Sequence, residues 1–123
     1  MPAKLTAADR MKFAKAKALS RRHDIPGVIK VMEELSVSYP DNAKIRAILA
    51  NAYWDSADVS SSEREFRKAV ELAPTLQIAS LGLFHCLWDL NRRDEALAEM
   101  KRFMALADSE DYKAILEELI RTP

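Results

Sequence analysis

The amino-acid sequence predicts an all-α fold, built as a stack of antiparallel helix pairs. The main evidence is a period of 34 residues, because a shift by this distance places Ala52–Asp55 (AYWD) on Cys86–Asp89 (CLWD). Pro40 and Pro74 are separated by the same distance. A fixed period of this length is typical of stacked helical repeats, in which each unit buries its apolar face only against its neighbours.

The composition agrees with this fold. Ala, Leu, Lys, Arg and Glu are abundant, and the only glycines are Gly27 and Gly82, which suits helices and leaves few positions for the tight turns of a sheet protein. We expect one domain over residues 1–123, with no apolar run of the roughly 18 residues that a membrane span needs. The N-terminal segment lacks the apolar stretch of a secretory signal. A single cysteine, Cys86, offers no disulfide framework, so we expect a reducing, cytoplasmic compartment.

Charge is unevenly distributed along the chain although the net charge is zero. Residues 1–30 hold eight Lys and Arg against two Asp (8 − 2 = +6), and residues 94–123 hold four Lys and Arg against eight Asp and Glu (4 − 8 = −4). Opposite ends of opposite sign favour head-to-tail association. Exposed ion pairs contribute only ~0–1 kcal/mol each, so we expect two solvated ends and a monomer or a weak homodimer.

Start and stop signals predict seven helices, over about residues 6–22, 24–39, 42–55, 58–72, 76–90, 94–107 and 109–121. Thr6 followed three residues later by Asp9 is a capping signal that opens the first helix. Asp24 can cap the second helix, which ends at Tyr39 because the following proline disfavours a helical residue before it.

The later helices have their own start signals. Asp58 or Ser60 can cap the fourth helix, and Ser60 with Glu63 fits a capping box. We expect Thr75 to cap the fifth helix and Ser109 to cap the seventh.

Apolar residues at helical spacing predict the core. The centre of the stack is expected at Ala50, Tyr53, Phe66, Ala69 and Leu72. The sixth helix is expected to turn inward Ala96, Leu97, Met100, Phe103 and Leu106. The seventh helix is expected to cover the sixth with Tyr112, Ile115, Leu116 and Leu119.

The middle unit, residues 43–76, resembles the tetratricopeptide repeat (TPR). It carries the family's pattern of aliphatic, small, aromatic, aromatic, alanine and proline residues at Leu49, Ala50, Tyr53, Phe66, Ala69 and Pro74. Units at about 9–42 and 77–110 match less closely, and residues 110–121 resemble the family's capping helix. The resemblance implies a right-handed α-solenoid. Phe84 and Phe103 stand at two normally small positions, and we expect them to push helices apart or redirect the last pair.

The resemblance also implies a binding surface, because the odd-numbered helices of this family line a concave face. Positions on one face of each such helix form the candidate peptide-binding groove: Arg10, Phe13, Lys17, Ser20, Lys44, Asn51, Trp54, Leu81, His85 and Trp88. Two interpretations stay open for Trp54 and Trp88: exposure for a partner, or packing between helices with the indole N–H bonded to a carbonyl.

A subgroup of the family grips a chaperone's C-terminal carboxylate through a clamp of Lys, Asn and Arg. The matching positions here are Phe13, Lys17, Ile48, Ile78 and Gly82. Only Lys17 has suitable chemistry, so we expect no clamp of that kind.

The sequence gives no support for catalysis. His85 and Cys86 are adjacent, so on a helix their side chains point about 100° apart and cannot form a dyad. His85 and Asp89 offer two metal ligands at most, which is weak evidence for a site. We therefore expect no catalytic residue, no metal site and no cofactor.

The sequence as a whole predicts a non-enzymatic adaptor or scaffold that binds a peptide or helix of another protein. The alternative is a nucleic-acid-associated module that uses the basic N-terminal helix. We rank it lower because the charges are spread around that helix and the pI is about 6.7.

Overall fold

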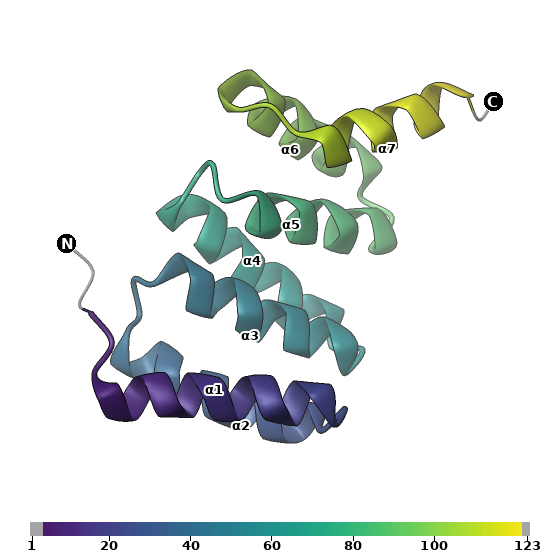
Figure 1. Ribbon diagram of the computed structural model, residues 1–123. Helices are drawn as coiled ribbons and strands as arrows, with labels where there is room; N and C mark the ends of the chain where they lie inside the picture. The colour runs from purple at the N-terminus through teal and green to yellow at the C-terminus, as the bar shows by residue number, and fades with distance from the viewer. Residues whose placement is uncertain (1–3, 122–123) are drawn as a thin grey trace.

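The computed structural model describes residues 4–121, and within them it contains seven α-helices and no strand. The helices are α1 (Ala7–Arg21), α2 (Ile25–Ser38), α3 (Ala43–Asp55), α4 (Val59–Leu72), α5 (Gln77–Asp89), α6 (Arg93–Leu106) and α7 (Glu110–Arg121). Figure 1 shows α1, α3 and α5 in one layer and α2, α4 and α6 in a second layer behind it. The predicted all-α stack of antiparallel helix pairs is confirmed.

Side-chain caps fix most of the helix starts. The Thr6, Asp24 and Asn42 side chains accept backbone N–H groups of α1, α2 and α3. Of the two candidates for α4, Asp58 is the cap, accepting from the Ser61 N–H at 3.2 Å. The Oγ of Ser109 accepts from the N–H of Tyr112 at 3.1 Å, as predicted for α7.

The prediction that Thr75 caps α5 is wrong. The residue in the cap position is Leu76, which has no side-chain acceptor, so the start of α5 lacks a capping hydrogen bond from a side chain. Asn42 occupies the same position 34 residues earlier and does cap α3. The repeat register sets where the helix begins, and it overrides the local capping preference of threonine.

A turn of one shape joins the two helices of each pair. His23, Ala57 and Asn91 all adopt left-handed backbone conformations, with φ of 59°, 66° and 61°, at intervals of 34 residues. In each case the next residue donates its N–H to the carbonyl five positions earlier, at 2.8 to 2.9 Å, which closes the helix as in a Schellman motif. None of the three residues is glycine, the usual residue at such a position.

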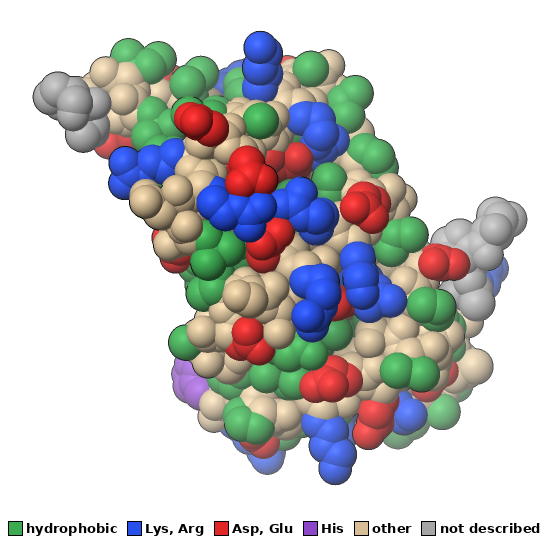
Figure 2. Space-filling view, turned by 180° about the vertical axis from the view of Figure 1, so that it is seen from behind, with side chains coloured by type: hydrophobic (Ala, Val, Ile, Leu, Met, Phe, Trp, Pro, Cys, Tyr) green, Lys and Arg blue, Asp and Glu red, His purple; other side chains and the backbone are tan. Residues whose placement is uncertain are grey.

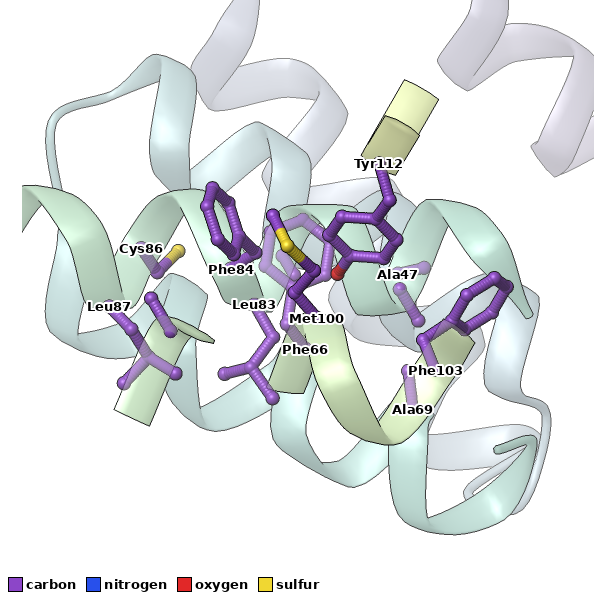
Figure 3. Close-up of a cluster of buried hydrophobic side chains, with 13 residues drawn as sticks. Ala47, Phe66, Ala69, Leu83, Phe84, Cys86, Leu87, Met100, Phe103 and Tyr112 are labelled. Carbon is purple, nitrogen blue, oxygen red and sulfur yellow. The ribbon is translucent and has the colours of Figure 1, made fainter. Parts of the chain in front are cut away.

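The buried side chains form two clusters that meet at α3. One joins α1, α2 and α3 and includes Met32, Leu35 and Ile45. The other joins α3 to α7 and includes Phe66 and Tyr112 (Figure 3).

The predicted centre of the core is only partly correct. Ala50, Phe66 and Ala69 are buried, whereas Tyr53 is half-buried and Leu72, the last residue of α4, is 41% exposed. Leu72 is therefore wrongly placed in the core. Leu97 and Leu106 of α6 and Leu116 of α7 are also exposed, contrary to prediction, because none of the helices within residues 4–121 covers the sides of α6 and α7 that carry them.

Buried glutamates tie the second helix of a pair to the first. Glu65 of α4 accepts from Arg46 of α3 at 2.7 Å. At the equivalent position of α6, Glu99 accepts from Ser80 of α5 at 2.7 Å and is also paired with Arg102. Both carboxylates are over 90% buried, so these partners satisfy charges that would otherwise be costly to bury.

Phe84 and Phe103 are both buried, and both rings meet Tyr112, with ring centroids 5.7 and 5.6 Å apart. The extra aromatic volume at these normally small positions is thus taken up at the junction with α7. In Figure 1, α7 runs obliquely to α5. The Tyr112 hydroxyl is hydrogen-bonded to the hydroxyl of Ser80 at 2.7 Å, which anchors α7 to α5.

Candidate peptide-binding groove

The candidate residues lie on α1, α3 and α5, whose shared face carries a row of four pockets. Neighbouring pockets have residues in common: Phe13 and Lys17 line the first two, Asn51 the second and third, and His85 the third and fourth. Each pocket therefore adjoins the next from α1 to α7, and we call this row the odd-helix groove. The opposite face, over α2, α4 and α6, carries interspersed charges of both signs (Figure 2).

The pocket between α1 and α3 has a volume of about 360 Å³. Both helices pack against α2, so α2 closes the bottom of the gap between them. The floor contains Ala16, Val28 and Met32, all buried. The rim is polar and carries Lys17, Ser20, Arg21, Asn51 and Asp55. An apolar floor with a few polar groups at its edge is typical of sites that hold a ligand side chain.

A pocket of about 380 Å³ beside it joins α1 to the start of α3. Its lining includes Arg10, Phe13, Lys17 and Lys44. The Lys17 ammonium lies 5.5 Å from the centroid of the Phe13 ring, close enough for a cation–π interaction. All three cationic side chains are exposed.

The middle of the groove is narrow because α3 and α5 pack closely. Asn51 and Trp54 of α3 face Gly82 and His85 of α5 there, with Phe66 of α4 below. A Cβ on Gly82 would lie 2.6 Å from Cδ1 of Phe66. Glycine at this position therefore permits the close approach of α5 to Phe66 of α4.

The last pocket lies between α5 and α7 and is mostly apolar. Phe84, His85 and Trp88 contribute one side, and Ile115, Glu118 and Leu119 of α7 contribute the other. Trp88 is stacked on Phe84, with centroids 5.7 Å apart and ring planes 21° apart. The Arg93 guanidinium lies over Trp88, 4.9 Å from its centroid.

Trp54 and Trp88 are each partly packed against other helices and partly exposed. Each is half-buried against the core cluster of α3 to α7, and each lines a pocket of the groove. Within residues 4–121, neither indole N–H donates a hydrogen bond to the protein, and neither is a buried polar group without a partner. Each ring therefore packs partly against the core and also contributes surface to a pocket.

Nine of the ten predicted groove residues line these pockets, and Leu81 does not, being half-buried against the core. Sequence reasoning missed Arg21 and Asp55 in the α1/α3 pocket and Glu118 in the α5/α7 pocket. The four-residue spacing on a helix could have found the first two, because Arg21 follows Lys17 and Asp55 follows Asn51 by one turn.

No activated nucleophile adjoins the groove among residues 4–121. Cys86 is fully buried, and its thiol donates to the Ser62 hydroxyl at 3.3 Å. Burial raises the pKa of this thiol to about 11, against a smaller opposing effect of the Ser62 bond. His85 is exposed, with its ring in an edge-to-face contact with Phe84.

Among residues 4–121, no three His, Cys, Asp or Glu side chains gather as a metal site would require. None of the helices of the described chain is both long and apolar enough to span a membrane.

At the level of sequence, no family model and no curated protein matches the chain. Solved structures do resemble it. The TPR domain of OM64 from Arabidopsis superimposes with a TM-score of 0.82 at 18% identity, over 94% of this chain and 97% of that one. The TPR2B domain of yeast Sti1, in its complex with pHsp70, gives 0.75 at 16% identity, over 80% and 78%.

MamA from Desulfovibrio magneticus RS-1, residues 41 to the end, gives a TM-score of 0.72 at 19% identity, over 77% of this chain and 54% of that one. This chain thus spans about half the length of that MamA structure. At such identities the likeness shows the fold alone. The fold is that of TPR domains, and the protein is a TPR-like α-solenoid.

Proposed function

We propose that this chain is a non-enzymatic adaptor whose odd-helix groove binds a peptide or helix of another protein. The observation that supports the proposal is the row of four adjoining pockets, in which each pocket shares at least one of Phe13, Lys17, Asn51 and His85 with its neighbour. A row of apolar pockets separated by polar side chains suits an extended partner that inserts side chains at intervals.

The fold comparison agrees with a protein partner, since the TPR2B domain of Sti1 was solved in a complex with pHsp70. The groove of this chain must use different contacts from a carboxylate clamp. At the clamp positions it has Phe13, Ile48, Ile78 and Gly82 beside Lys17, so a terminal carboxylate would meet mostly apolar groups. An internal segment of the partner fits these residues better.

Peptide selection with groove variants tests the proposal. Twelve-residue random peptides displayed on phage would be selected on the purified chain, and their affinities measured by fluorescence anisotropy. Asn51→Ala with His85→Ala removes two exposed groove side chains and should weaken the selected peptides about 30-fold, at ~1 kcal/mol for each of the two lost hydrogen bonds.

The matched control is Lys101→Ala with Glu71→Ala, which removes exposed side chains of α6 and α4 that lie outside the four pockets. It should leave the affinities unchanged. Selected peptides that tolerate the groove variant and lose affinity with the control would contradict the proposal.

A further inference from the structure

We propose that the α1/α3 pocket selects an acidic segment of the partner that carries one bulky apolar side chain. The apolar side chain enters the pocket, and the acidic residues on either side of it meet the cations of the rim. The inference rests on the proposed function and specifies the chemistry of the partner at one end of the groove.

The pocket has the depth and lining for one such side chain. Its apolar lining comes from three helices and includes Ile25, Val28 and Met32 of α2 and Ile48 of α3. Ile25 and Ile48 are only half-buried, so apolar surface remains exposed in the lining of the pocket. Burying it under a leucine- or phenylalanine-sized group removes this surface from water, which drives the insertion.

The rim and the adjoining pocket carry a net positive charge, because four cations stand against one acidic residue. Lys17 and Arg21 line this pocket, and Arg10 and Lys44 join Lys17 in the adjoining pocket. Within residues 4–121, none of these four side chains takes part in a salt bridge. Asp55 is the single acidic residue in the lining of the two pockets.

The other end of the groove differs in charge and gives the partner a direction. The α5/α7 pocket is lined by Glu118, with no Lys or Arg in its lining. The Arg93 guanidinium over Trp88 and the Glu118 carboxylate give that end charges of both signs, so an acidic segment would be attracted more strongly at the α1/α3 end. The acidic part of the partner therefore lies over α1 and the start of α3.

The same cations do not favour a nucleic acid. Duplex binding commonly uses about 6–10 phosphate contacts, whereas four cations surround these two pockets. Single strands need aromatic faces on which bases stack, and Phe13 is half-buried with Lys17 over its ring. A nucleic acid would also leave the apolar floor of the α1/α3 pocket unfilled.

The test uses the selected peptides whose binding depends on Asn51 and His85, synthesised with acetylated N-termini and amidated C-termini so that no terminal charge contributes. These peptides should contain an excess of Asp and Glu near one leucine, isoleucine, methionine or phenylalanine. Replacing that apolar residue by serine should lower the affinity about 10- to 100-fold, and replacing the acids by lysine should abolish binding.

Protein variants supply the matched comparison. Lys17→Glu should weaken the peptides about tenfold, and the loss should shrink as salt rises. Lys15→Glu makes the same charge change on α1 at an exposed residue outside the four pockets and should have no effect. Ser20→Leu places an apolar group at the pocket rim and should compete with the anchor, with circular dichroism confirming that each variant stays folded.

The outcomes separate the two proposals. Groove-dependent peptides that are neutral or basic, or that tolerate Lys17→Glu, would overturn the inference and leave the proposed function standing. If no selected peptide depends on the groove, both the inference and the proposed function are wrong.

Two other occupants are also distinguished. A labelled single-stranded RNA of 20 nucleotides that binds more tightly than the peptides, and that Lys17→Glu releases, would replace the acidic segment with a nucleic acid. Self-association that Lys17→Glu abolishes, measured by light scattering, would identify the acidic helix α7 of a second copy as the occupant. Either result overturns the inference.

Discussion

Gly82 of α5 and Phe66 of α4 offer a sharp test of the packing between neighbouring helix pairs. A methyl group on Gly82 would lie 2.6 Å from Cδ1 of Phe66 and closer still to Cε1 and Cζ. These are the atoms at the far end of a ring that is only 4% exposed. Gly82→Ala therefore forces the ring or the whole of α5 to move.

The expected magnitude follows from two opposing effects. Overpacking a core typically costs about 1–3 kcal/mol, whereas alanine in a helix interior is about 1 kcal/mol better than glycine. Gly82→Ala should therefore destabilise the protein by up to about 2 kcal/mol. Phe66→Ala alone should cost about 3–5 kcal/mol, the usual range for a buried aromatic residue.

The double variant gives the decisive result, because removal of the ring removes the clash. In the Phe66→Ala background, Gly82→Ala should stabilise the protein by about 0.5–1 kcal/mol, since only the helix preference remains. The effect of one substitution thus changes sign with the other, a coupling of about 2 kcal/mol.

Urea unfolding followed by circular dichroism measures all four free energies of unfolding. Additive effects, or a Gly82→Ala variant more stable than the parent, would refute the close approach of α5 to Phe66. A Phe66→Ala variant as stable as the parent would place Phe66 outside the core and undermine the 34-residue register.

Other substitutions test the turns, the buried charges and the buried thiol. Ala57→Gly relieves a left-handed alanine at φ 66° and should raise the free energy of unfolding by about 1 kcal/mol; an unchanged or lower urea midpoint would contradict this. Arg46→Ala leaves the carboxylate of Glu65 buried without its closest partner and should cost about 3 kcal/mol, whereas Arg46→Ala with Glu65→Leu should recover most of it; no recovery would show that the pair matters for another reason. Because burial raises the pKa of Cys86 from 9.0 to about 11, the neutral thiol is favoured in the folded state. Its contribution is complete below pH 9 and is lost between about pH 9 and 11, so stability should fall there by ~2 kcal/mol more in the parent than in Cys86→Ala; equal pH profiles would contradict the raised pKa.

The sequence predicted the seven helices to within a residue or two, because capping residues, prolines and apolar spacing act over a few neighbours. The prediction from sequence failed at positions whose burial depends on how the helices are arranged in space. Leu97 satisfies the apolar stripe of α6, yet it is 39% exposed because no other helix of the described part of the chain covers that side of α6. Leu72 and Leu106 occupy equivalent last positions of α4 and α6 and are exposed for a similar reason.

The groove shows the same division. Positions that face one side of α1, α3 and α5 follow from the repeat and could be predicted residue by residue. The pockets could not, because they depend on the distance between helices. A gap separates α1 from α3, and α2 closes the bottom of that gap. By contrast, α5 lies close to α4, because Gly82 has no side chain where it meets Phe66. Both distances depend on the volumes of the side chains that are in contact across the stack.

The division of the core into two clusters that meet at α3 has a consequence for how the molecule opens. Helix α1 buries only Ala16 completely, so detaching it exposes little apolar surface, whereas α5 loses six buried residues if it leaves its neighbours. In a stack whose units contact only their neighbours, the helix that opens most readily is the one whose detachment exposes the least apolar surface. Amide hydrogens of α1 should therefore exchange with solvent well before those of α5. A ligand seated between α1 and α3 would slow that exchange, so its affinity would include the free energy of holding α1 in place.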